Sequence, residues 1–255
     1  MCLILFAWDP EAEDQLIVAA NRDEFYARPS QNAHFWEHCN QIFAGKDLQQ
    51  QGTWLGVTAT GRFAAVTNYR KPDKNQYPLS RGALTTNFLK SECSPEEYLQ
   101  QIQGEQNQYA GFNLLVGDRS SLYYYSNRSD QLPQPLAPGT YGLSNHLLNT
   151  PWPKVTTGVT EFSRIITDNA CSLSNQQKHL LNLLQNDNVA DESLLPETGI
   201  DTTIEKMLSP LFIKSPDYGT RASTIVRIQL NGCISFLEQN YSAGGRLAEQ
   251  VTYPA

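Results

Sequence analysis

Cys2 is the residue whose position in this sequence most directly suggests chemistry. It follows the initiator methionine, which is normally removed ahead of so small a side chain, so the mature chain is expected to begin with a thiol and a free α-amino group on one residue. A thiol pKa of ~8.5 and an amine pKa of ~7.7–8.0 allow the amine to accept the thiol proton near neutral pH. The alternative is an inert thiol that opens a strand, because buried cysteines are common. The sequence therefore predicts either a nucleophile with its own base or an ordinary strand residue.

A charged Asn-Arg-Asp-Glu segment ends the second apolar stretch of the chain, and it can be placed against Cys2. If the two stretches form a hairpin in which Phe6 faces Val18, Cys2 lies opposite Arg22. Directly opposed residues have Cβ atoms about 4.5–5.5 Å apart, so the guanidinium would favour the thiolate. A register that differs by one residue places Asp23 opposite Cys2 instead, where it could anchor the α-ammonium. The alternative for the whole segment is a solvated strand end.

Composition excludes several classes of function. The chain has 255 residues and a net charge of −7, and no basic stripe, so nucleic acid is not an expected partner. The apolar start lacks the basic residues of an export signal, and no stretch approaches the ~20 apolar residues of a membrane span, so no membrane insertion is expected. Five cysteines without a CxxC pair are typical of a reduced, cytoplasmic protein. We expect a single domain over residues 1–255, of unspecified oligomeric state.

One short segment resembles a metal site. His34, His38 and Cys39 combine an i, i+4 histidine pair with a thiol. A structural zinc site needs four ligands, and no fourth ligand lies nearby. We therefore expect no metal site.

The order of the expected elements predicts the fold. Apolar strands are expected at residues 2–8 and 16–20, and three further hairpins follow at 54–67, 112–125 and 224–237. Helices are expected from about residue 80, at 95–103, across 155–166 and after Ser174, with Ser174 and Gln177 as its cap. Strands that are apolar on both faces must be covered on both sides. The sequence thus predicts an α+β fold, a four-layer α-β-β-α sandwich of two stacked antiparallel sheets.

The chain as a whole resembles the NRDE family, also called the transport-and-Golgi-organisation type. The resemblance rests on ordered motifs along essentially the whole sequence. These motifs are Met1-Cys2, residues 20–30 (ANRDEFYARPS), 52–56 (GTWLG), 67–69 (TNY), 111–114 (GFNL), 139–145 (GTYGLSN), 150–154 (TPWPK) and 218–221 (YGTR).

The resemblance implies a fold and a set of site residues. Family members are thought to share the N-terminal nucleophile (Ntn) hydrolase fold and look distantly similar to the choloylglycine hydrolase and penicillin V acylase group. By resemblance, the catalytic roles fall on Cys2, Arg22, Asp23, Asn68, Asn145 and Arg221. The sequence departs from that group because its early arginine and aspartate are adjacent. Adjacent strand residues face opposite sides, so either Asp23 or Glu24 is the acidic partner of Cys2.

Two functions follow from this resemblance. The first is an amidohydrolase acting on a non-peptide C–N bond of an N-acylated small molecule, in which Asn68 or Asn145 donates to the oxyanion and Arg221 binds the substrate acid or the leaving side. That reaction requires no cofactor. The second is a non-catalytic carrier that holds haem or an acyl-lipid in the same pocket, because family members have been linked to haem handling and lipid metabolism.

Overall fold

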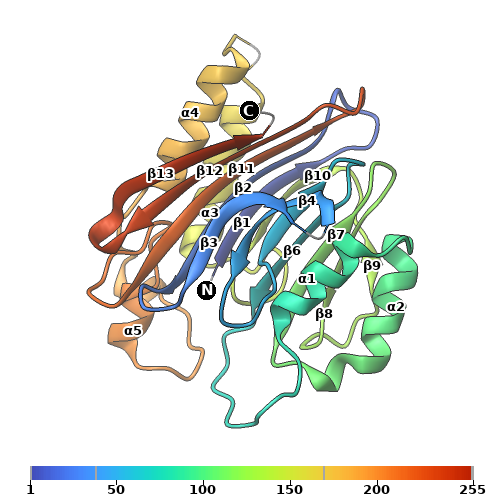
Figure 1. Ribbon diagram of the computed structural model, residues 1–255. Coiled ribbons are helices and arrows are strands. Elements are labelled where there is room, and N and C mark those ends of the chain that lie inside the picture. Colours follow the sequence, from blue (N-terminus) through green and yellow to red (C-terminus); the bar gives the residue numbers. More distant parts are fainter. Residues whose placement is uncertain (1, 38, 169, 254–255) are drawn as a thin grey trace.

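The four-layer α-β-β-α architecture is confirmed by the computed structural model, which describes residues 2–37, 39–168 and 170–253. Two antiparallel sheets lie face to face, and helices cover the outer face of each (Figure 1). The six-stranded sheet has the order β10-β1-β2-β11-β12-β13, and the seven-stranded sheet has the order β3-β4-β5-β6-β7-β8-β9.

The six-stranded sheet carries the N-terminal strand second from one edge, between β10 and β2. Its strands are β1 (Cys2–Trp8), β2 (Asp14–Phe25), β10 (Gly139–Leu143), β11 (Tyr218–Gln229), β12 (Ile234–Ser242) and β13 (Arg246–Tyr253). Helices α3 (Pro153–Ile166) and α4 (Leu173–Leu184) pack on its outer face through an apolar cluster that includes Leu3, Leu5 and Phe162. The short α5 (Thr202–Met207) precedes β11.

The seven-stranded sheet is built from the middle of the chain. Its strands are β3 (Ser30–Trp36), β4 (Cys39–Asp47), β5 (Leu55–Thr58), β6 (Phe63–Asn68), β7 (Phe112–Gly117), β8 (Leu122–Ser126) and β9 (Gln134–Pro135). Helices α1 (Arg81–Lys90) and α2 (Pro95–Glu105) cover its outer face through a second cluster around Phe88 and Leu99.

Alternation along β1 explains why this strand is apolar at successive positions. Ile4, Phe6 and Trp8 point into the core between the sheets, whereas Leu3 and Leu5 point to the helices. Successive strand side chains face opposite sides, and here both sides are buried. By the same alternation, Cys2 lies on the face that is directed at the other sheet.

The helix starts follow the predicted capping residues with one exception. Ser80 caps α1, and Ser94 forms a complete capping box with Glu97 at the start of α2. The prediction that Ser174 caps the fourth helix is wrong. The cap is Ser172, whose Oγ accepts a hydrogen bond from the backbone N–H of Asn175 at 3.4 Å, so the helix begins two residues earlier than expected.

Two further findings concern membranes and metals. In the part of the chain that the structure describes, none of the helices combines the length and the apolar character that a membrane crossing requires. Over the same residues, no group of three or more His, Cys, Asp or Glu side chains gathers as metal ligands do. His34 and Cys39 lie on the neighbouring strands β3 and β4, and His38 lies outside the described residues.

Candidate functional site

The register of the first hairpin is confirmed, and it places Cys2 opposite Arg22. Phe6 pairs with Val18, and the pairing continues without a shift to the Cys2–Arg22 pair at the strand end. The alternative register, in which Asp23 faces Cys2, is therefore wrong. Cys2 and Arg22 share the face of the six-stranded sheet that is directed at the seven-stranded sheet.

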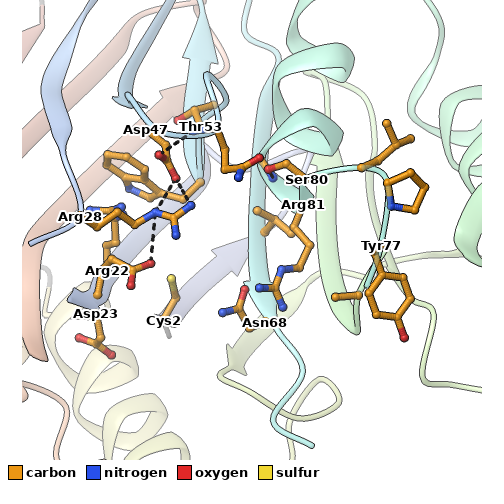
Figure 2. A pocket seen from close by; sticks show the side chains of 18 residues that line it. Cys2, Arg22, Asp23, Arg28, Asp47, Thr53, Asn68, Tyr77, Ser80 and Arg81 are labelled. Carbon is orange, nitrogen blue, oxygen red and sulfur yellow. Dashed lines mark hydrogen bonds and ion pairs between the residues drawn. The ribbon is translucent and has the colours of Figure 1, made fainter. Parts of the chain in front are cut away.

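Cys2 lines a cavity of about 340 Å³ between the two sheets. Figure 2 shows the thiol between two groups of side chains, with Arg22 and Arg28 on one side and Asn68 and Arg81 on the other. The wall opposite the hairpin comes from residues 47–54 and 77–82, which flank β5 and the start of α1. The cavity therefore depends on the stacking of both sheets and not on the hairpin alone.

A close approach of two glycines sets the shape of that wall. A Cβ atom on Gly52 would lie 2.6 Å from the carbonyl carbon of Gly82, at the start of α1. Only glycine permits this approach without moving the backbone. The backbone N–H of Thr53 also donates to Thr86 Oγ1 of α1 at 3.1 Å. The segment that ends in Trp54 is thus fixed against the helix that begins with Arg81.

Arg22 is the buried cation of the site. Only 6% of its surface is exposed, and its guanidinium lies 4.1 Å from the ring centroid of Trp54. Among the described residues, no hydrogen bond or carboxylate within 4 Å engages this guanidinium. A buried guanidinium whose N–H groups donate no hydrogen bonds favours an anion beside it, and that anion can be a thiolate or a ligand group.

Arg28, by contrast, is already neutralised. Its Nε and Nη2 atoms lie 2.8 Å and 2.7 Å from Asp47 Oδ2, and Glu24 lies 3.7 Å away. Partial burial acts in the opposite direction, but the hydrogen bonds from Arg28 hold the pKa of Asp47 below its usual range. This ion pair forms one rim of the cavity and leaves Arg22 as the free charge on that side.

The Cys2 thiol is protonated more firmly than a free cysteine. Burial raises its pKa and the negative charge of Asp23 adds to the rise, whereas the charge of Arg22 lowers it. The thiol therefore requires a base, and a free α-amine at Cys2 would supply one.

Removal of the Arg22 charge should move the reactivity of Cys2 to higher pH. Since the thiolate is the reactive form and Arg22 lowers the thiol pKa, Arg22→Gln is expected to raise that pKa further. The measurement is the rate of Cys2 alkylation by iodoacetamide as a function of pH. Arg22→Lys, which keeps the charge, serves as the control and should retain the wild-type midpoint more closely. A midpoint that is equal in all three proteins would exclude this role of Arg22.

Asp23 lies at the same strand end but faces the helices. Its Oδ1 accepts a hydrogen bond from Thr220 Oγ1 at 2.7 Å, and Figure 2 shows the carboxylate directed away from Arg28, below Cys2. Burial raises the pKa of Asp23, and the charge of Lys154 opposes that rise. Glu24 is instead engaged with Arg28. Of the two acids, Asp23 is the one whose charge acts on the Cys2 thiol.

Lys154 was not selected as a site residue from the sequence, although it belongs to the Thr-Pro-Trp-Pro-Lys motif. It is buried on α3, and its Nζ donates to the carbonyl of Leu208 at 2.8 Å. Burial lowers the pKa of Lys154 to about 8, while the charge of Asp23 opposes the shift. A buried acid and a buried base thus lie beneath the strand end that carries Cys2.

Asn68 and Asn145 occupy different positions relative to the cavity. Asn68 lines it, and within the described part of the chain the Asn68 side-chain amide makes no hydrogen bond. Asn145 does not line it; its Nδ2 donates to the Asn68 carbonyl at 3.0 Å, and its own carbonyl accepts from the backbone N–H of Arg70 at 2.6 Å. Asn68 is therefore the asparagine available to a ligand, and Asn145 positions it.

Arg221 lies outside the Cys2 cavity. It is the extra residue of a β-bulge, because the pairing of β11 with β2 shifts between Thr220 and Ala222. Its Nη1 donates to the carbonyls of Phe25 at 3.0 Å and of Arg28 at 3.1 Å. The structure thus shows Arg221 holding the turn between β2 and β3, and Arg221 is not among the residues that line the Cys2 cavity.

Arg81 is the cavity residue that sequence reasoning missed. It is the first residue of α1, and its Nη1 donates to the Gly111 carbonyl at 3.2 Å. No carboxylate lies within 4 Å of its guanidinium among the described residues. Its position after the capping Ser80 marked only a helix start, and its place in the cavity follows from the stacking of the sheets.

Comparison with known proteins identifies relatives over nearly the whole chain. The sequence model described as Transport and Golgi organisation 2 matches residues 1–243. The Transport and Golgi organization protein 2 homologs of Bos taurus and Homo sapiens are 38% and 37% identical over 261 and 260 residues, which cover 94% of this chain and 93% of each relative. A solved structure, a mutant conjugated bile acid hydrolase from Clostridium perfringens, aligns with a TM-score of 0.47 and 11% identity over 100% of this chain and 97% of that one.

Proposed function

Because the chain belongs to the Transport and Golgi organisation 2 family, whose sequence model spans Cys2 and every wall of its cavity, we propose that this cavity is a reaction site with Cys2 as nucleophile. The proposed reaction is hydrolysis of a non-peptide C–N bond in a small N-acylated molecule. The observation that carries the proposal is a half-buried thiol paired across two strands with Arg22, whose guanidinium makes no hydrogen bond or ion pair among the described residues.

The chemistry of this reaction follows from the groups around the thiol. Once Met1 is removed, the α-amine of Cys2 accepts the thiol proton, and the sulfur attacks the acyl carbonyl carbon. The carbonyl electron pair moves to the oxygen and then returns as the C–N bond breaks, and the proton passes to the leaving nitrogen. Water then cleaves the thioester, which releases the acid and restores the thiol.

Three residues have distinct proposed roles around this sequence of steps. Arg22 stabilises the thiolate, since its charge lowers the thiol pKa. Asn68 donates to the developing oxyanion, because its amide lines the cavity and makes no hydrogen bond in the described chain. Asp23, beneath the strand end, orients the α-ammonium.

Asn68→Ala should slow turnover with little effect on stability. Removal of one oxyanion donor commonly costs about 10²–10³ in kcat. The measurement is release of the amine from a panel of N-acyl compounds, and Asn175→Ala on the exposed face of α4 is the matched control. Equal rates in Asn68→Ala and wild type would remove Asn68 from the mechanism.

The carrier alternative can be judged from the lining of the cavity. Six of its eighteen lining residues are charged, namely Arg22, Asp23, Glu24, Arg28, Asp47 and Arg81. A haem ring or an acyl chain needs predominantly apolar walls, and the residues present do not fit that requirement. The lining therefore supports a small polar ligand. A saturable shift of the haem absorption band on titration, lost in Cys2→Ala, would favour the carrier.

The state of the five cysteines indicates the redox conditions of the compartment in which the protein acts. All of them are free, and none is fully buried. We expect the protein to act in a reducing compartment, the cytoplasm.

A further inference from the structure

A second cavity, of about 440 Å³, adjoins the Cys2 cavity. The two cavities share Tyr77, Arg81 and Ala110 as lining residues. Arg81 thus stands at the boundary between them, on the side of the Cys2 cavity that lies opposite Arg22 (Figure 2). A ligand that is longer than the Cys2 cavity could extend past Arg81 into this second space.

The charge of the second cavity is opposite to that of the chain. Its lining contains three cationic side chains, Lys71, Arg81 and Arg128, against the single carboxylate of Asp73. The surplus is two positive charges, in a protein whose net charge is −7. Such a local reversal favours an anionic ligand group, since a cleft lined by one sign of charge concentrates ions of the other sign.

Among the described residues, Arg128 is the one cation that forms an ion pair with the Asp73 carboxylate. Arg128 Nη2 lies 3.1 Å from Asp73 Oδ2 and 3.4 Å from the hydroxyl oxygen of Tyr77. Tyr77 in turn donates to Asp73, so these three side chains hold one another in place. No carboxylate of the described chain lies within 4 Å of the Lys71 or Arg81 nitrogens. The charges of Lys71 and Arg81 are therefore available to a ligand.

We propose that this second cavity binds the anionic end group, a carboxylate or a phosphate, of an elongated ligand whose acyl carbonyl lies at Cys2. Arg81 and Lys71 pair with the anion, and Arg128 orients the loop that carries Lys71 and Tyr77. The assignment of the carbonyl end rests on the proposed function. The anion site itself requires only that a ligand reach Cys2.

Alkylating probes of matched length test the proposal without any turnover. N-iodoacetyl-6-aminohexanoate carries a reactive carbon at one end and a carboxylate at the other, and its methyl ester has nearly the same length without the charge. The measurement is the ratio of their rates of Cys2 alkylation, followed by peptide mass mapping. The acid is expected to react about tenfold faster than the ester, because charge-assisted hydrogen bonds from Lys71 and Arg81 would hold its carboxylate in the second cavity.

Substitutions then locate the anion. Lys71→Gln and Arg128→Gln are each expected to lower the acid-to-ester ratio, and the preference that remains is that of Arg81. Lys74→Gln is the matched control, because Lys74 is exposed on the same loop and lines neither cavity. A ratio near one in the wild type, or a ratio that is unchanged in Lys71→Gln and Arg128→Gln, would overturn the proposal.

Two further probes distinguish a carboxylate ligand from a phosphate ligand, and a distant anion site from one beside Cys2. N-iodoacetyl-4-aminobutyl phosphate replaces the carboxylate by a phosphate at nearly the same length, and the faster of the two anionic probes identifies the group that the site prefers. Iodoacetate is too short to reach past Arg81, so an equal effect of Lys71→Gln on iodoacetate would contradict a distal site. Absence of hydrolysis would remove the proposed function and leave the alkylation ratio intact, so the two failures are distinguishable.

Discussion

Replacement of Cys2 by alanine is expected to abolish covalent labelling of the N-terminal peptide by an N-acyl or β-lactam probe. The thiol is the nucleophile of the proposed cavity, and no other cysteine lines it. An acyl group transferred from the probe would remain on the sulfur as a thioester, which intact mass and peptide mapping detect. The substitution removes one sulfur atom. It should leave the fold intact, because Cys2 is only half-buried and lies at the end of its strand.

Cys233→Ala provides the matched control for this experiment. Cys233 is an exposed free thiol in the turn between β11 and β12, far along the chain from the cavity. Its variant should be labelled at Cys2 as strongly as the wild type. Equal labelling of Cys2→Ala and wild type would show that the probe reacts elsewhere and would remove the catalytic claim.

Glu205→Ala is expected to destabilise the fold by about 3–5 kcal/mol, because it breaks a buried ion pair. Arg70 and Glu205 form this pair with side chains that are only 5% and 3% exposed. The Arg70 guanidinium also lies 4.7 Å from the ring centroid of Trp152. The substitution leaves a buried guanidinium without its main counter-charge, and the free energy of unfolding in urea measures the cost.

This ion pair also supports the site. Arg70 follows Asn68 by two residues, and its backbone N–H donates to the carbonyl of Asn145. The matched control is Glu192→Ala, whose partner Lys206 lies 3.8 Å away with 51% of its side chain exposed. Exposed pairs contribute less than about 1 kcal/mol. Equal losses in the two variants would contradict the structural role assigned to the Arg70–Glu205 pair.

The first hairpin shows what the sequence could predict well. Its two strands are apolar on both faces, which predicts the hairpin but leaves two registers open, and the structure adopts the one that pairs Phe6 with Val18. The position of Cys2 opposite Arg22 then follows by counting. The four layers were predictable for the same reason, since sheets that are apolar on both faces require cover on both sides.

The walls of the cavity could not be predicted in this way. Arg81 and Trp54 meet the hairpin only because the second sheet stacks on the first, and no local pattern fixes which residues then face one another. The approach of Gly52 to Gly82 is likewise a tertiary contact between segments that are thirty residues apart. Strands β3 and β4 went unpredicted because polar residues are mixed into them without a clear alternation.

The side-chain contacts of Arg221 and Asn145 could not be predicted from the sequence. Both positions match motifs, yet the bulge in β11 turns Arg221 toward the β2–β3 turn, and Asn145 donates to the backbone of Asn68 behind the cavity wall. A bulge adds one residue and redirects one side chain, which residue types alone do not reveal. Arg221 therefore holds the β2–β3 turn and Asn145 holds the backbone of Asn68, and both contacts become visible only in the folded chain.

The intact mass of the purified chain shows whether the base of the proposed mechanism is present. The proposed mechanism uses the α-amine of Cys2 as the base for its own thiol, and that amine is free only when Met1 has been removed. We expect a mass that corresponds to a chain beginning at Cys2. A mass that retains Met1, in protein that still releases amine from an N-acyl compound, would contradict it.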